Sequence, residues 1–438
     1  MHTRIWKDTL ALCLILTISL MVISACSQMP ADRSSPTSDD HQRDLPETES
    51  ASKQPTTDQA WFEHICETTG FSLLTSFEIQ QIPELDEPAA RSPFQDPVFG
   101  TCLVRVTDRS ADLQAGGTSE GMKNEYSRVQ SFNADESRLI VFTTEGNWYL
   151  YDAVSLQPIG LLPIWHEPRW DAEDPDLLYF TEETKLMSYS ISNGQQQVIH
   201  DFADDFPGQE LAAVWTKYEG SPSLDGRYWG LMAEDQDWMT IALLIYDMET
   251  DQITARRETP PSEIDSVTVS PLGNYFLAYY DNFCDPGQLG SDRNPCGLMV
   301  FDRDLENARG LLLIVGHADL VLNARREEAF VYQDIDKYHI SMLDLASGEI
   351  TPLLPIDFSH SALGFLFSGR AFRLPGWVLV STSNGAQPSA TWMDDQIFAL
   401  ELVENGRVVR LAHTPVSYTH LTLPTNRVAG GCGGGGGG

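Results

Sequence analysis

The sequence predicts an all-β fold, and within that class a β-propeller, on three observations. Short apolar runs alternate with turns rich in Gly, Asp and Asn through most of the chain, as β-strands joined by tight turns do. A strand that ends in a polar turn recurs at intervals of roughly 38 to 57 residues, which is the period of a four-stranded propeller blade. Amphipathic helical periodicity is scarce after Asn124. A pair of β-sandwiches is the rival fold.

Six polar residues mark the end of the recurring strand. They are Asp152, Ser190, Asp247, Asp302, Asp344 and Glu401. Each is followed by a turn and another short strand, which predicts six visible four-stranded blades. The expected blades span residues 126–163, 164–206, 207–261, 262–315, 316–357 and 358–413.

A propeller must close into a ring, because an open end exposes a sheet edge. The strand 101–107 lies outside the six blades, and we expect it to be the outer strand of a final blade. Seven blades are therefore the expected total, with the rest of the seventh after His413. On this interpretation the last blade is truncated.

The character of the chain changes abruptly after His413. Residues 415–427 resemble a peptide produced when sequencing-adapter DNA is translated, and the glycine run that ends the chain resembles a homopolymer base call. We therefore interpret residues 414–438 as an artefactual tail. A natural glycine-rich tail is the alternative.

The N-terminal segment predicts export. Arg4 and Lys7 precede an apolar run at 10–23, which ends in small residues before Cys26; this is the order of a signal peptide. The run is about 14 residues, shorter than the roughly 20 of a membrane-spanning helix. Residues 22–26 resemble the bacterial lipobox, and this resemblance implies that Cys26 is lipidated and becomes the first mature residue. An ordinary signal peptide with an incidental cysteine is the alternative.

The expected organisation follows from these boundaries. Residues 1–26 form the lipoprotein signal peptide, 27–60 a disordered polar tether, 61–125 an N-terminal segment and 126–413 the propeller. Ser27 lacks the aspartate associated with inner-membrane retention, so we expect a lipid-anchored protein of the outer membrane or cell surface.

The chain is strongly acidic, with 28 Lys and Arg against 63 Asp and Glu and a formal net charge of -35. Such a surface repels phosphate backbones, so nucleic acid is excluded as a partner. The same charge argues mildly against a long polyanionic substrate.

Four cysteines lie in the folded body: Cys66, Cys102, Cys284 and Cys296. An even count in an oxidising compartment predicts disulfide bonds. We expect Cys284 to pair with Cys296, because both lie in the turn-rich insertion 281–297. Cys66 then pairs with Cys102 by elimination. A metal site is the alternative, although no C-x-x-C spacing supports it.

Three histidines stand at blade boundaries: His317, His360 and His413. If their side chains converge in the channel they could bind a divalent metal, supported by Asp319. The arrangement resembles the oligogalacturonate lyase propellers, which hold a divalent metal through histidines of successive blades. That resemblance implies a metal-dependent lyase or hydrolase acting on an oligouronate or similar sugar acid. Independent structural roles for the three histidines are the alternative.

Two functions therefore stay open. Residues 373–382 and 316–319 look like secreted bacterial propellers, and TolB-type propellers present a rigid ring to a small ligand or partner. We favour binding of a carbohydrate or protein ligand at the central channel, because the acidic charge disfavours a polyuronate and no complete catalytic set is visible. Five tryptophans could stack on sugars, although most should be core: Trp165, Trp170, Trp215, Trp229 and Trp238.

Overall fold

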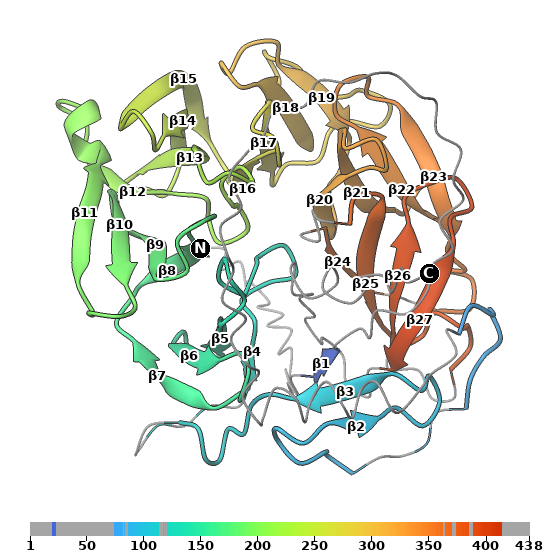
Figure 1. Ribbon diagram of the computed structural model, residues 1–438. Coiled ribbons are helices and arrows are strands. Elements are labelled where there is room, and N and C mark those ends of the chain that lie inside the picture. Colours follow the sequence, from blue (N-terminus) through green and yellow to red (C-terminus); the bar gives the residue numbers. More distant parts are fainter. Residues whose placement is uncertain are drawn as a thin grey trace, which may run out of the picture.

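The computed structural model describes residues 20–22, 74–81, 83, 86–113, 117, 119, 121–361, 364–369, 374–384 and 389–413. Within these segments six four-stranded antiparallel sheets follow one another in sequence order and stand as blades around a central axis (Figure 1). The predicted all-β propeller with six four-stranded blades is confirmed. The helical content of the described chain is a single 3-10 turn, Phe202–Asp205, and no described helix is long and apolar enough to span a membrane.

The strands of blades one to three follow the chain from the inside of the ring outwards. They are β4 (Met122–Lys123), β5 (Arg138–Thr143), β6 (Trp148–Asp152) and β7 (Pro158–Leu162); β8 (His166–Trp170), β9 (Leu177–Glu182), β10 (Lys185–Ser190) and β11 (Gln196–Asp201); and β12 (Leu211–Trp215), β13 (Tyr228–Asp235), β14 (Thr240–Asp247) and β15 (Gln252–Ser262).

Blades four to six repeat this order. They contain β16 (Ile264–Val269), β17 (Tyr275–Tyr280), β18 (Leu298–Asp302) and β19 (Arg309–Leu312); β20 (Ala318–Leu322), β21 (Glu328–Asp334), β22 (His339–Asp344) and β23 (Ile350–Pro355); and β24 (Gly364–Ser368), β25 (Trp377–Ser383), β26 (Gln396–Glu401) and β27 (Val408–His413).

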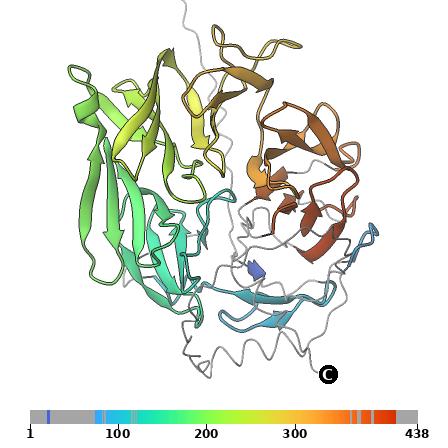
Figure 2. The same cartoon turned by 45° about the horizontal axis from the view of Figure 1, so that its top comes forward.

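The antiparallel order of each blade places the connections on two opposite faces of the ring. Figures 1 and 2 show the first strand of each blade toward the axis and the fourth on the outside. One face carries the segments that lead into the innermost strands, together with the hairpins between second and third strands. We call this the entry face, and it contains the openings where the sequence predicts functional residues.

The recurring polar residue has a local structural reason. The Asp152 carboxylate accepts hydrogen bonds from the backbone N–H groups of Val154 and Ser155 at 3.1 and 2.8 Å, and Asp344 accepts one from Ser347 at 2.7 Å. Each side chain thereby satisfies donors of the turn that joins the third and fourth strands. The landmark seen in the sequence is thus the turn chemistry of successive blades.

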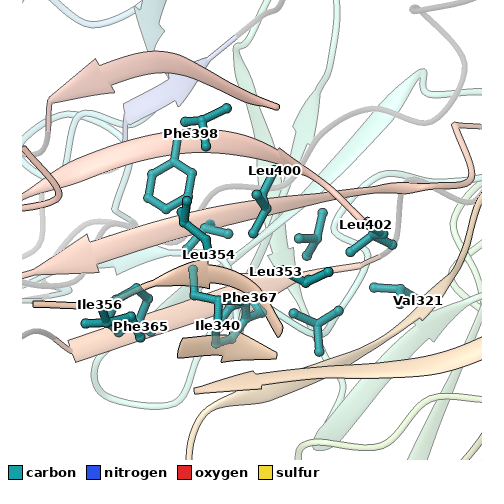
Figure 3. Close-up of a cluster of buried hydrophobic side chains, with 14 of the residues drawn as sticks. Val321, Ile340, Leu353, Leu354, Ile356, Phe365, Phe367, Phe398, Leu400 and Leu402 are labelled. Atoms are coloured by element: carbon teal, nitrogen blue, oxygen red, sulfur yellow. The ribbon is translucent and has the colours of Figure 1, made fainter. Parts of the chain in front are cut away.

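Apolar side chains pack between the faces of neighbouring blades. Between blades five and six, Val321 and Ile340 pack with Phe365, Phe367 and Phe398 in one fully buried cluster (Figure 3). Buried aromatic rings of this size contribute most of the apolar area removed from water. Because every blade buries both faces in this way, the blades are held at fixed angles around the axis.

A three-stranded sheet lies between blades six and one (Figure 1). Its strands are β1 (Leu20–Val22), β2 (Phe94–Gln95) and β3 (Cys102–Arg105), with β3 in the middle. Leu103 packs toward blade six, whereas Val104 packs toward blade one, as alternating strand residues do.

The expectation that strand 101–107 is an outermost strand is corrected by this sheet. The Asp96 carboxylate accepts hydrogen bonds from the backbone of Val98 and Phe99, both at 2.8 Å, and closes a tight turn that folds β2 against β3. β3 therefore has a partner on each side. β1 belongs to the predicted signal peptide, so removal of residues 1–25 would take away one of these partners.

The predicted disulfide between Cys284 and Cys296 is formed, with the two Cα atoms 5.1 Å apart. It closes the insertion between β17 and β18. Cys102 is also disulfide-bonded, but its predicted partner, Cys66, lies outside the described residues. Cys26, the tether at 27–60 and the tail at 414–438 lie outside them as well.

A fully buried arginine fastens the N-terminal segment to blade six. Arg410, on β27, is 1% exposed, and its guanidinium donates to the carbonyl oxygens of Ser76 at 3.0 Å and Glu78 at 2.8 Å. It also donates to the Gln396 side chain at 3.0 Å. Burial lowers the pKa of Arg410 to about 10, so these hydrogen bonds compensate a costly desolvation.

We expect Arg410→Met to lower the free energy of unfolding by about 2 to 4 kcal/mol, because it leaves buried carbonyls without their donor. Denaturant titration measures the change. Arg407→Met is the matched control, since Arg407 pairs with Glu401 at the surface and its loss should cost less than about 1 kcal/mol. Equal losses in the two variants would contradict a fastening role for Arg410.

Candidate functional site

The three predicted histidines occupy different environments. His317 lies just before β20, the innermost strand of blade five, and its Nδ1–H donates to the carbonyl oxygen of Phe365 in blade six. Burial lowers the pKa of the His317 imidazole, and the Arg128 charge lowers it further. This histidine therefore links blades five and six.

The other two histidines point elsewhere. His360 lies in an exposed turn, where its Nδ1 is 2.7 Å from the Asp357 carboxylate. His413 ends β27, an outermost strand, and is 8% exposed. Burial lowers the pKa of His413 to about 4, with a contribution from Arg410. Its Nε2 atom is buried with no hydrogen-bond partner.

The structure therefore does not bring His317, His360 and His413 together. In the part of the chain that the structure describes, no group of three or more His, Cys, Asp or Glu side chains is placed to hold a metal ion. The physical reason is radial position, because a residue on the fourth strand of a blade lies far from one before the first strand. Asp319 is likewise engaged, accepting from the backbone N–H groups of Leu320 and Gly369 at 2.7 and 2.6 Å.

A different set of polar residues meets at the axis. Glu167, on β8, is fully buried and accepts hydrogen bonds from the backbone N–H and hydroxyl of Thr216 at 3.0 and 2.9 Å, and from the N–H of Tyr218. Lys217 and Tyr218 both have left-handed backbones, with φ of 61° and 75°. Such a pair is strained, and the Glu167 carboxylate holds the segment after β12 in this path toward the axis.

Gly220 is required where this segment returns to its blade. A Cβ atom at this position would lie 2.2 Å from the carbonyl oxygen of Val267 and 2.5 Å from the Cβ of Thr216. No side chain fits at those distances. The close approach allows blade three to lean on blade four at the axis.

Arg169 joins blades one, two and three. Its side chain is 4% exposed and pairs with Glu125 at 2.7 Å. It also donates to the carbonyl oxygens of Gly220 at 2.7 Å and Tyr218 at 2.9 Å. Burial raises the pKa of Glu125 to about 7, the Arg169 charge opposes that rise and the Glu167 carboxylate adds to it. The result is a buried acid that titrates near neutral pH.

Arg128 crosses the axis. It lies after β4 in blade one, pairs with Glu219 of blade three at 2.7 Å, and stands 5.0 Å over the Tyr279 ring of blade four. Blades one and four are not neighbours in the ring, so these contacts pass through its interior. We call Glu125, Arg128, Glu167, Arg169 and Glu219 the axial network.

Exposed aromatic rings lie beside this network on the entry face. Trp165 is 61% exposed, Trp238 56% and Tyr218 43%. Ring contacts connect them through His166 and Trp215: Trp165 to His166 at 6.3 Å, His166 to Trp215 at 6.2 Å, His166 to Tyr218 at 5.7 Å, and Trp215 to Trp238 at 5.9 Å. We call Trp165, His166, Trp215, Tyr218 and Trp238 the aromatic platform.

Hydrogen bonds position the residues that lie beneath the platform. The Trp215 indole N–H donates to Glu234 at 2.8 Å, and Glu234 also receives Lys217 Nζ at 3.3 Å. Lys217 in turn donates to the carbonyl oxygen of Ile264 at 2.9 Å. The Trp148 indole donates to the Trp165 carbonyl at 2.7 Å. Trp170, Trp215 and Trp229 are buried, so of the five tryptophans only Trp165 and Trp238 are exposed.

The opposite face has a hollow of about 780 Å³ between the turns of blades four, five and six. Its lining includes Asn323, Arg325, Glu327 and Asp344. These residues are turn-closing groups that bond to their own loops, as Asn323 does to the N–H groups of Arg325 and Glu327. The aromatic platform is therefore the stronger candidate for ligand contact.

Sequence reasoning missed the axial network and the platform as units. The network comes from three blades and the platform from two, in short stretches separated by tens of residues, so no local motif connects them. One signal was available, namely polar and charged residues in the innermost strands, such as Glu167 and Arg169 beside buried Trp170. Such residues in a strand expected to be apolar indicate channel-facing positions.

Comparison with known proteins supports the assignment of a β-propeller fold. No protein-family model matches the chain, and no curated protein matches its sequence. A solved oligogalacturonate lyase in complex with manganese matches with 13% identity and a TM-score of 0.51, over 75% of this chain and 85% of that one. An oligogalacturonate lyase from Vibrio parahaemolyticus matches with 13% identity and a TM-score of 0.49, over 77% and 87%.

TolB from Acinetobacter baumannii matches with 17% identity and a TM-score of 0.33, over 62% of this chain and 61% of that one. At 13% identity, the likeness to the manganese-bound oligogalacturonate lyase shows a shared β-propeller fold. This agrees with the resemblance seen in the sequence. The manganese named for the lyase requires a ligand set, and the three predicted histidines do not form one here.

The raised pKa of Glu125 predicts a pH dependence of stability. Because the folded state favours the protonated acid, the stability that this group contributes is complete below its ordinary pKa near 4.5 and is lost as pH rises through about 7. We expect Glu125→Gln, which mimics the protonated form, to gain stability relative to wild type between pH 5 and 8. Denaturant midpoints at four pH values across that range measure it.

Glu401→Gln is the control for this experiment. The Arg407 hydrogen bond holds the pKa of Glu401 below its usual value, so Glu401 does not titrate between pH 5 and 8. Its variant should follow the wild-type profile in parallel. A parallel profile for Glu125→Gln as well would contradict the assignment.

Proposed function

We propose that this chain is a membrane-tethered, extracytoplasmic propeller that binds a small ligand or partner at the entry-face mouth of its central channel. The observation that carries the proposal is the aromatic platform, a group of five rings beside the axis of which all but Trp215 are exposed. Clustered exposed aromatics on an otherwise acidic surface favour a binding site.

The axial network favours a ligand-binding site at the mouth of the channel over one inside the channel. Its carboxylates and guanidinium groups are paired with one another across blades one to three, and Arg128 and Arg169 are 5% and 4% exposed. Groups engaged in this way fix geometry and leave little room for a ligand between them. A ligand would therefore rest above the network.

The proposal of a membrane tether is based on the sequence. The lipobox-like residues before Cys26 and the polar stretch 27–60 favour a body held away from a membrane. The disulfide between Cys284 and Cys296 fits an oxidising compartment. These features support a membrane-tethered, extracytoplasmic location for the protein.

Metal-dependent lyase activity is the weaker alternative. It needs a metal-binding group at the channel, and His317, His360 and His413 do not fit one. His317 is used between blades, His360 pairs with Asp357 at the surface, and His413 is buried on an outer strand. The described residues therefore favour binding over lyase chemistry.

Hydrogen exchange of the full chain tests where ligands bind. A panel of neutral and anionic oligosaccharides, amines and short peptides is first screened by thermal shift, and each hit is followed by amide exchange. We expect protection of 215–219 and 263–266, which flank the mouth. Protection confined to 323–328 and 344–349, on the opposite face, would overturn the proposal, as would the absence of any hit.

A further inference from the structure

Two indole rings of the platform are exposed to solvent. Trp165 and Trp238 each expose more than half of their surface, although burial of an apolar ring is favourable. The backbone carbonyl of Trp165 accepts a hydrogen bond from the Trp148 indole, and the Trp238 ring contacts the Trp215 ring. Exposed indoles are suited to a partner that carries a flat apolar face.

The spacing of the rings indicates a ligand longer than one sugar ring. Trp165 and Trp238 are not in contact with each other, and three successive ring contacts of about 6 Å join them through His166 and Trp215. A pyranose presents one C–H face of roughly the size of an indole. A ligand that covers both tryptophans therefore needs at least two linked rings.

The charges at the mouth select against acidic sugars. The cationic groups that point into it are already engaged, Lys217 by Glu234, Arg128 by Glu219 and Arg169 by Glu125. None of these three cations is free to pair with the carboxylate of a uronate, whose burial would need a cation or several donors.

An acidic rim strengthens this selection. Asp265 is the second residue of β16, the innermost strand of blade four, and its side chain is exposed near the entry-face end of that strand. The surrounding protein raises its pKa by desolvation, and the carboxylates of Glu219 and Asp281 raise it further by repulsion. A site in which carboxylates already repel one another disfavours another anion. The same oxygens accept hydrogen bonds from hydroxyl groups.

From these observations we infer that the ligand of the mouth is an uncharged oligosaccharide of at least two rings, stacked on Trp165 and Trp238 with hydroxyl groups toward the acidic rim. This inference rests on the proposed function and names its ligand class. It differs from what the lyase likeness would imply, since an oligogalacturonate is an anion.

Four tetrasaccharide probes test the inference on the full chain: cellotetraose, maltotetraose, N-acetylated chitotetraose and tetragalacturonate. Binding is measured by isothermal titration and by tryptophan fluorescence. We expect at least one of the three neutral probes to bind and to change the fluorescence. Tetragalacturonate should bind at least tenfold more weakly than that probe.

Substitution of the platform tests the location. In Trp165→Ala combined with Trp238→Ala, the Kd of the neutral probe should rise by roughly tenfold or more, since two stacking contacts are lost. Both side chains are exposed, so the fold should be retained, and the unfolding midpoint checks this. Phe283→Ala combined with Tyr338→Ala is the matched control, because these residues are also exposed on the entry face, at 70% and 58%, but lie outside the platform.

These outcomes distinguish a failure of the inference from a failure of the proposed function. If no neutral probe binds, if tetragalacturonate binds as tightly, or if the platform variant binds like the control, the inference is wrong. The proposed function still stands if another compound of the screening panel protects 215–219 and 263–266. If no compound protects the mouth, the proposed function is wrong as well.

Discussion

The Arg128 guanidinium lies in the interior of the ring, between blades one, three and four. It pairs with Glu219 and stacks over Tyr279, so blades one, three and four are tied by one side chain. A buried guanidinium requires a partner for its charge. The positions of the segments after β4 and β12 are therefore set by this requirement.

The shape of the mouth follows from the same constraint. Because Glu167 and Arg169 hold residues 216–220 toward the axis, the strained backbone at Lys217 and Tyr218 lifts the Tyr218 ring beside His166. Trp215 and Trp238 then complete the platform from blade three. Packing alone would place these rings between blades, as it does with Trp229.

The sequence reveals the features that repeat in each blade. It does not reveal the sites that are assembled from residues of several blades. The polar residue at Asp152 or Asp344 closes its own turn, so its meaning is local and its recurrence predicts a blade. The disulfide at Cys284 and Cys296 is local for the same reason. A shared site of His317 and His413 fails because sequence position says nothing of which strand faces the axis. The strand 101–107 was expected at an edge, whereas the turn at Asp96 supplies a partner beyond it.

The account stands on the coupling between Arg128 and Glu219, and a double-mutant cycle measures it most directly. The free energy of unfolding is determined for wild type, Arg128→Met, Glu219→Gln and the double variant. If the pair ties blades one and three across the axis, the double variant should be more stable than the sum of the single losses implies, by about 1.5 kcal/mol or more. Single losses that add within about 0.5 kcal/mol would show that the two side chains act independently and would contradict the account.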